Sequence, residues 1–143
     1  MKILIFGLPG SGKTTLAEPL ANLLGAVWIN ADKIRSYYEG PDMSKWDFSL
    51  EGRMRQALRM RHLADGVVMS GRIAVTDFVC PTEAARKQFD PDFTVWMDTI
   101  KEGRYDDTNK MFEDPPKCDY HVAKWFNDTH TELLPLIKKY MER

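Results

Sequence analysis

The stretch GLPGSGKT, residues 7–14, is the part of the chain whose spacing points most directly to chemistry. It fits the pattern G-x-x-x-x-G-K-[ST] in full. Glycines let the backbone wrap with its amides pointing inward, and those amides bind phosphate oxygens together with the positive end of a following helix. We expect Lys13 to reach the terminal phosphates of a nucleotide and Thr14 to ligate Mg²⁺. The alternative is a glycine-rich turn that only caps a helix; the eight matching positions and the strand–loop–helix context argue against it. The predicted nucleotide-binding residues are Gly7, Pro9, Gly10, Ser11, Gly12, Lys13, Thr14 and Thr15.

Two acidic residues follow later apolar runs and are candidates for metal and hydroxyl chemistry. Asp77 ends the run IAVTD and resembles a Walker B position, where a carboxylate holds Mg²⁺ through water. Capping of the following turn is the alternative role for Asp77. Asp32 lies in NADKIR, with Arg35 three residues further on. Taken alone, Asp32 is an acid in the first turn of a helix, where the helix dipole favours a negative charge.

An arginine on the inward face of a predicted helix is a further candidate. In the helix predicted over residues 49–70, positions three and four apart place Arg53 and Gln56 on the same stripe as an apolar core face. A buried guanidinium is costly unless a carboxylate or an anionic ligand pairs with it. Two interpretations stay open: an internal ion pair of Arg53, with Asp32 as the candidate partner, or an anion-binding site.

The elements that must position these residues alternate between strands and helices. Apolar runs predict strands over residues 2–6, 26–30, 73–78, 93–98 and 120–122. Helical patterns cover residues 12–24, a short stretch from about residue 32, 49–70, 80–89 with Pro81 as its first helical residue, and 131–143. This alternation predicts an α/β fold: a three-layer P-loop NTPase-type domain over residues 1–143, with a mainly parallel five-stranded sheet.

Composition excludes several function classes. The 143 residues carry a net charge of −1 without a basic block, which argues against a nucleic-acid partner. No apolar run reaches membrane-spanning length, and the first run is broken by the phosphate-binding motif, so we expect no membrane partner and no signal peptide. Cys80 and Cys118 have no metal or redox spacing and predict free thiols in a reducing compartment, the cytoplasm. The sequence does not fix the oligomeric state and leaves a homodimer open.

Several stretches, in order, resemble the adenylylsulfate kinases, which transfer the ATP γ-phosphate to the 3′-hydroxyl of adenosine 5′-phosphosulfate. GLPGSGKTT resembles that family's G-L-S-G-[AS]-G-K-[ST]-T, and NADKIR resembles D-G-D-N-[IV]-R. FSLEGRMRQALR resembles F-S-x-x-D-R-x-E-N-I-R-R, DFVCP resembles S-F-I-S-P, and VWMDT resembles V-[FY]-V-D-[TV]. The resemblance covers most of residues 1–98.

The resemblance implies a small-molecule kinase with ATP and Mg²⁺ as cofactors and adenylylsulfate or a related acceptor. Asp32 matches the residue that orients or deprotonates the acceptor hydroxyl, so Lys13 and Asp32 are the implied catalytic residues. Arg35 and Arg53 match arginines that bind the phosphosulfate, and Phe48 matches a ring that stacks on the adenine. The implied acceptor-binding residues are Asp32, Arg35, Phe48, Arg53, Gln56 and Val79; the implied metal-binding residues are Thr14 and Asp77.

The chain departs from that family at four positions. Asn30 replaces the first Asp of the acceptor motif, which alters a metal or hydrogen-bond contact. Cys80 replaces the family's phosphoserine, so we expect direct in-line transfer. Thr82 and Glu83 replace a Tyr-Arg pair and are expected to bring an anion near the acceptor.

Residues 99–119 form the largest departure. Ten of these twenty-one residues are charged and two are proline, so we expect a surface loop or a small mobile lid, shorter than the family's basic lid. Arg104 is a predicted nucleotide contact, with Lys110 as a second cation over the ATP phosphates and Phe112 as a second stacking ring.

Three functions stay open at this point. The first is a kinase of adenylylsulfate-kinase type, and the second is a kinase of another nucleoside, nucleotide or sugar. The third is a nucleotide-binding module without turnover. The presence of Lys13, Thr14, Asp32 and two candidate acceptor arginines argues against the third, because a sensor needs no acceptor site.

Overall fold

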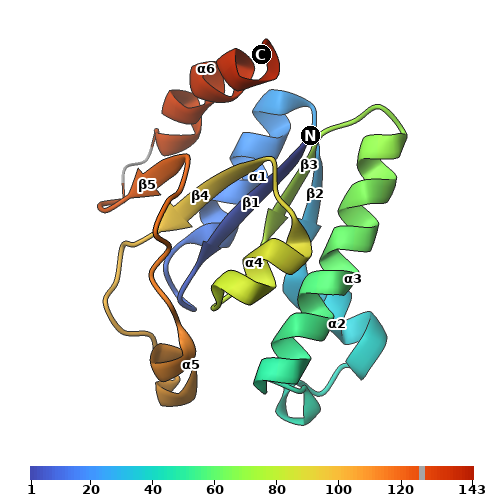
Figure 1. Ribbon diagram of the computed structural model, residues 1–143, viewed down its shortest axis with the longest axis vertical. Helices are drawn as coiled ribbons and strands as arrows, with labels where there is room; N and C mark the ends of the chain where they lie inside the picture. The colour runs from blue at the N-terminus through green and yellow to red at the C-terminus, as the bar shows by residue number, and fades with distance from the viewer. Residues whose placement is uncertain (126–127) are drawn as a thin grey trace.

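Five strands form a single all-parallel sheet in the computed structural model, which describes residues 1–125 and 128–143 (Figure 1). The strands are β1 (Lys2–Gly7), β2 (Val27–Asn30), β3 (Ala74–Asp77), β4 (Phe93–Met97) and β5 (Tyr120–Val122). Their order across the sheet is β2-β3-β1-β4-β5, and each pair of neighbours is parallel. The predicted parallel sheet is confirmed, and its strands end within two residues of the predicted limits.

Helices cover both faces of this sheet (Figure 1). They are α1 (Lys13–Leu24), α2 (Ala31–Glu39), α3 (Leu50–Met69), α4 (Glu83–Phe89), α5 (Asp106–Met111) and α6 (Thr129–Met141), with a short 3₁₀ helix over Met43–Lys45. Helices α1 and α6 pack on one face of the sheet, and α3 and α4 pack on the other. The predicted three-layer α/β fold is therefore confirmed.

The central strand β1 shows why its sequence is apolar without alternation. Ile3 and Ile5 are buried in the cluster under α1 and α6, whereas Leu4 and Phe6 are buried in the cluster under α3 and α4. A strand covered on both faces must be apolar at successive positions. The continuous run 2–6 therefore places β1 at the centre of the sheet.

The start of α4 differs from the prediction. The helix begins at Glu83, and Pro81 lies outside it. The Thr82 side chain caps the helix by accepting a hydrogen bond from the Ala85 amide at 3.1 Å. Cys80 has a φ angle of 44°, so the chain turns before Pro81 can enter a helix.

The charged segment 99–119 contains structure that the sequence did not predict. Its middle part forms α5, in which Thr108 is buried while most other residues are exposed. In the part of the chain that the structure describes, none of the helices has the length and apolar character needed to cross a membrane.

Candidate active site

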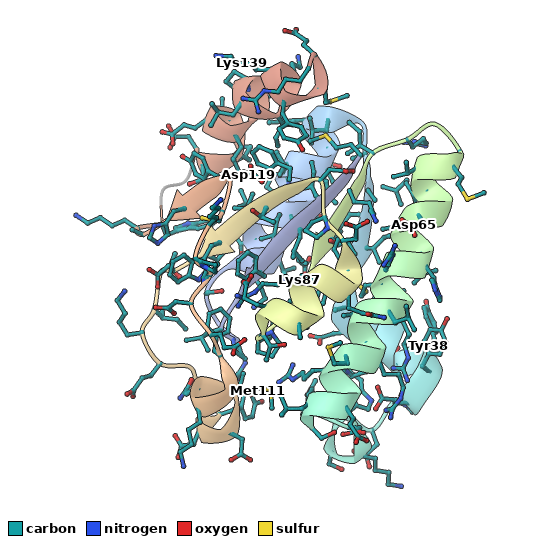
Figure 2. All side chains as sticks on the ribbon, viewed as in Figure 1. Tyr38, Asp65, Lys87, Met111, Asp119 and Lys139 are labelled. Atoms are coloured by element: carbon teal, nitrogen blue, oxygen red, sulfur yellow. The ribbon has the colours of Figure 1, made fainter. Side chains whose placement is uncertain are left out.

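A cavity of about 800 Å³ opens where β1, β2 and β3 end. It lies in the region flanked by α5, marked by Met111 in Figure 2, and by α2 and α3, near Tyr38 in the same view. Of the predicted phosphate-loop residues, Gly7 and Ser11 do not line it. The predicted residues that do line it are Pro9, Gly10, Gly12, Lys13, Thr14, Thr15, Asp32, Arg35, Phe48, Arg53, Gln56, Asp77, Val79 and Arg104.

The loop before α1 needs glycine at two positions for different reasons. A side chain at Gly7 would bring its Cβ to 2.5 Å from the Met97 carbonyl oxygen and 2.9 Å from Ser11 Oγ. Gly12 caps α1 with a φ angle of 96°, which non-glycine residues adopt at a cost. The loop therefore wraps closely around the first turn of α1, as a phosphate-binding loop must.

Lys13 lies half-buried at the start of α1. Its Nζ donates a hydrogen bond to the Leu8 carbonyl oxygen of its own loop at 3.0 Å. Burial lowers the pKa of Lys13 to about 8, and the charges of Asp77 and Asp32 oppose this shift. A cation held in a desolvated loop gains stabilisation from an incoming phosphate.

Asp77 at the end of β3 is surrounded by side-chain donors. Its carboxylate accepts hydrogen bonds from Trp28 Nε1 at 2.6 Å and Asn30 Nδ2 at 3.1 Å, with Thr14 Oγ1 at 3.4 Å. Burial raises the pKa of Asp77, and the Trp28 hydrogen bond opposes this shift. Among described residues its carboxylate binds no backbone amide, so it does not cap the following turn. The Thr14 hydroxyl and the Asp77 carboxylate are hard oxygen ligands of the kind that suits Mg²⁺.

Asn30 makes two interactions at once, a helix cap and a hydrogen bond to Asp77. Asn30 Oδ1 accepts a hydrogen bond from the Lys33 amide at 3.1 Å and caps α2, while its Nδ2 donates to Asp77. Asp32 therefore lies in the first turn of a helix that is already capped. The Asp32 side chain is exposed toward the cavity and, among described residues, makes no hydrogen bond or ion pair.

Arg53 is buried as predicted, with 8% of its surface exposed, but Asp32 is not its partner. Its Nη2 donates to Thr108 Oγ1 at 3.1 Å, and its guanidinium carbon lies 4.8 Å from the centre of the Phe48 ring. Burial, together with the nearby charge of Arg35, lowers the pKa of Arg53 to about 10. Its Nε has no hydrogen-bond partner, and no described carboxylate pairs with it. The internal ion pair proposed as one interpretation is therefore absent.

Arg35 is also buried, but it has a carboxylate partner. Its Nη1 donates to Glu39 Oε2 at 3.1 Å and to the Asp47 carbonyl oxygen at 2.9 Å. Glu39 Oε2 also accepts from Arg59 Nη1 at 2.7 Å, so two guanidiniums share one carboxylate. The Arg35 guanidinium carbon lies 4.8 Å from the centre of the Phe48 ring, which itself is 40% exposed.

Gln56 lines the cavity with both ends of its amide engaged. Its Nε2 donates to the Ala31 carbonyl oxygen at 2.9 Å, and its Oε1 accepts from Arg59 Nη1 at 3.1 Å. These bonds tie the first residue of α2 to α3. They hold the backbone next to Asp32 in place, while acceptor contact by Gln56 remains a prediction.

Three residues that were expected near the ligands, Glu83, Lys110 and Phe112, do not line the cavity. Glu83 forms an ion pair with Arg86 at 2.6 Å and does not line the cavity, so no anion enters there from this position. Phe112 does not line the cavity either: its ring centre lies 6.5 Å from that of Phe6. Among residues 99–119 the cavity is lined by Arg104, Tyr105, Asp107 and Thr108, and Lys110 is not among them. The sequence identified one of these four, Arg104.

Comparison with known proteins agrees with this geometry. Residues 3–94 match a family described as AAA domain. The chain belongs to this family. It is also 35% identical over 81 residues to a probable adenylyl-sulfate kinase from Aeropyrum pernix, which confirms the resemblance found in the sequence. That stretch covers 56% of this chain and 44% of the relative, so the chain matches less than half of that protein.

Solved structures with low sequence identity share the fold of this AAA domain. A sugar kinase from Janibacter sp. HTCC2649 superposes with a TM-score of 0.73 at 15% identity, covering 97% of this chain and 94% of that one. An APS kinase from Mycobacterium tuberculosis, solved in complex with AMPPNP and APS, superposes with a TM-score of 0.73 at 17% identity and 96% coverage of both chains. The fold is that of a P-loop kinase.

Proposed function

We propose that the protein is an ATP-dependent phosphotransferase. It transfers the γ-phosphate to a hydroxyl of an anionic acceptor, and adenosine 5′-phosphosulfate is the first candidate. The observation that carries this proposal is Arg53, a buried guanidinium without a carboxylate, facing the same cavity as Lys13 and Asp32. A phosphate loop, an acid and an unpaired cation around one cavity are what a transfer between two anionic substrates requires.

The nucleotide side of the site rests on the loop before α1. Lys13 and the loop amides bind the phosphates, and Thr14 with Asp77 would hold Mg²⁺. Bound Mg²⁺ neutralises charge on the transferring phosphate. Arg104 lines the cavity from the segment after β4 and supplies a further cation.

The acceptor side carries an excess of positive charge. The wall of the cavity on this side contains Arg35 and Arg53, and Arg59 lies behind it. Among described residues, Glu39 is the one carboxylate that pairs with any of these three arginines. Buried charge without compensation is costly, so this wall favours a ligand that brings negative charge. Guanidinium groups bind phosphate and sulfate oxygens through several hydrogen bonds at once.

Direct transfer follows from the remaining residues. Asp32 is exposed at the cavity and free to accept a hydrogen bond from the acceptor hydroxyl. Burial raises the pKa of the Cys80 thiol far above its ordinary value, so this group stays protonated and is a poor nucleophile. The hydroxyl oxygen therefore attacks the γ-phosphorus, the bond to the ADP oxygen breaks, and the hydroxyl proton passes to Asp32.

A sugar or sugar acid is the second candidate acceptor. The structural likeness to a sugar kinase and the presence of Asp107 in the cavity lining support this alternative. Measurement of ADP release with adenosine 5′-phosphosulfate, AMP, adenosine, gluconate and neutral sugars separates the two. We expect the highest kcat/KM with adenosine 5′-phosphosulfate. If only a neutral sugar is turned over, the acceptor is a sugar. If no acceptor is turned over, the protein is a nucleotide-binding module without turnover.

Replacement of Arg53 tests the acceptor site. Arg53→Met is expected to weaken acceptor binding by roughly 10- to 150-fold, because a hydrogen bond to a charged group contributes about 1.5–3 kcal/mol. ATP affinity and melting temperature should stay close to wild type, since removal of Arg53 leaves no described carboxylate unpaired and frees only the neutral Thr108 hydroxyl. Two titrations and a thermal melt measure these effects.

Arg55→Met is the matched control for this experiment. Arg55 lies two residues away on α3, is 50% exposed and pairs with Asp47 on the surface. It should leave acceptor binding unchanged. Unchanged acceptor affinity in Arg53→Met itself would remove Arg53 from the site.

The state of Lys13 predicts a pH dependence of nucleotide binding. Its pKa is about 8, and bound phosphates favour the charged form. Binding therefore takes up a proton above pH 8, and ATP affinity should fall by up to about tenfold per pH unit there. Titrations with AMPPNP and Mg²⁺ between pH 7 and 9.5 measure this. Lys13→Met should bind weakly without that slope, and an equally flat wild type would contradict the prediction.

A further inference from the structure

Thr108 is a buried residue on an otherwise exposed helix. It is 5% exposed, whereas the other residues of α5 are exposed or half-buried. Its hydroxyl oxygen accepts the hydrogen bond from Arg53 Nη2 at 3.1 Å, across 55 residues of sequence. Thr108 is therefore the point at which the segment after β4 meets α3.

This contact holds Arg53 in place, since no carboxylate among residues 1–125 and 128–143 pairs with it. The guanidinium has two described neighbours that fix its direction: the Thr108 hydroxyl and the Phe48 ring at 4.8 Å. A ring face constrains the plane of a guanidinium, whereas a hydrogen bond fixes its rotation within that plane. The direction of the remaining Arg53 donors therefore depends on Thr108.

The segment around α5 is also attached to the nucleotide side of the cavity. Asn109 closes the loop before α5 by bonding both the amide and the carbonyl of Gly103, at 2.8 and 2.9 Å. Gly103 lies against the phosphate loop, where an added Cβ would sit 3.1 Å from the Pro9 carbonyl oxygen. After α5, the Glu113 amide donates to the Pro81 carbonyl oxygen at 2.7 Å. Helix α5 thus connects the phosphate loop to Arg53.

We propose that Thr108 is a positioning residue for the acceptor site. Its hydrogen bond to Arg53 couples the degree of order of α5 to the binding of an anion at Arg53. This inference rests on the proposed function, because it assigns the acceptor's anionic group to Arg53. An anion bound to Arg53 restrains the guanidinium, and through Thr108 it restrains α5. Loss of the hydroxyl releases both partners.

Kinetics of Thr108→Val test the positioning role. Valine keeps the volume and removes the hydroxyl, so the KM for adenosine 5′-phosphosulfate should rise about 3- to 10-fold while kcat and the KM for ATP stay within about twofold. Thr108→Ser should restore most of the acceptor KM. In an Arg53→Met background, Thr108→Val should have no further effect, because the partner is already absent.

Thr94→Val is the matched control. Thr94 is half-buried and bonds Asp119 away from this cavity, so the same substitution there should change neither KM. An equal rise in the KM values for both substrates in Thr108→Val would indicate a structural role and overturn the proposal. Additive increases of the acceptor KM in the double variant with Arg53→Met would do the same.

Hydrogen exchange tests the coupling without turnover. In the ligand-free protein, Thr108→Val and Arg53→Met should each raise the exchange rates of the hydrogen-bonded α5 amides, 109–112, about tenfold, and the double variant should exchange no faster than either. Adenosine 5′-phosphosulfate should slow this exchange in wild type and not in Arg53→Met. Unchanged α5 exchange in Thr108→Val would overturn the coupling. If wild type turns over no acceptor, the proposed function fails, while the exchange of the ligand-free variants still decides whether Arg53 and α5 are joined.

Discussion

Lys13→Ala is expected to lower phosphoryl transfer by roughly 10³-fold or more, the largest effect of any single change in this site. The loss of one preorganised donor at a developing charge costs about 10²–10³ in kcat, and this donor is also a full cation in a desolvated loop. Since the hydrogen bond of Lys13 Nζ goes to the Leu8 carbonyl oxygen of its own loop, removal of the side chain should leave the fold intact. The measurement is ADP release at saturating ATP from purified, folded variant.

Lys33→Ala serves as the control for this variant. Lys33 lies on α2 with an exposed side chain, and only its backbone amide takes part in the cap of that helix. Its turnover should match wild type. Near-normal turnover of folded Lys13→Ala would remove the kinase assignment, whatever the acceptor assays show.

The strands and the phosphate loop were predictable because they depend on local signals. A strand buried on both faces requires successive apolar residues, and Ile3 to Phe6 show this directly. The motif at residues 7–14 imposes its own backbone path through Gly7 and Gly12. The apolar run and the glycine motif each lie within a few consecutive residues, so the local structure they predict depends little on contacts with distant parts of the chain.

The partner of Arg53 was not predictable, because it depends on a contact between distant segments. The helical stripe of α3 indicated that Arg53 is buried, and this is confirmed. Thr108 lies on α5, which has six residues, too few for a helical period, and this helix is too polar for a core signal. The same limit explains why Phe112, which directly follows that helix and packs against Phe6, was assigned to the cavity.

Asp32→Asn is expected to lower turnover by roughly 10²-fold or more, with a melting temperature close to wild type. A positioned base contributes about 10²–10⁴ to a proton-transfer step, and asparagine cannot take the proton of the acceptor hydroxyl. The structural cost should be small: Asn30 caps α2, so the substitution leaves the cap in place. What it removes from folding is the interaction with the helix dipole, about 0.3–1 kcal/mol.

Glu51→Gln separates catalysis from this dipole effect. Glu51 is the acid in the first turn of α3, as Asp32 is in α2, but it does not line the cavity. The two variants should therefore melt alike, while only Asp32→Asn loses turnover. If both variants lose the same stability and Asp32→Asn keeps its activity per folded molecule, Asp32 is a helix-terminal acid and the acceptor hydroxyl needs another base. Asp107 would then be the residue to replace next, because it lines the cavity from α5. A loss of turnover in Asp107→Asn would place the base on α5, the helix that Thr108 joins to Arg53.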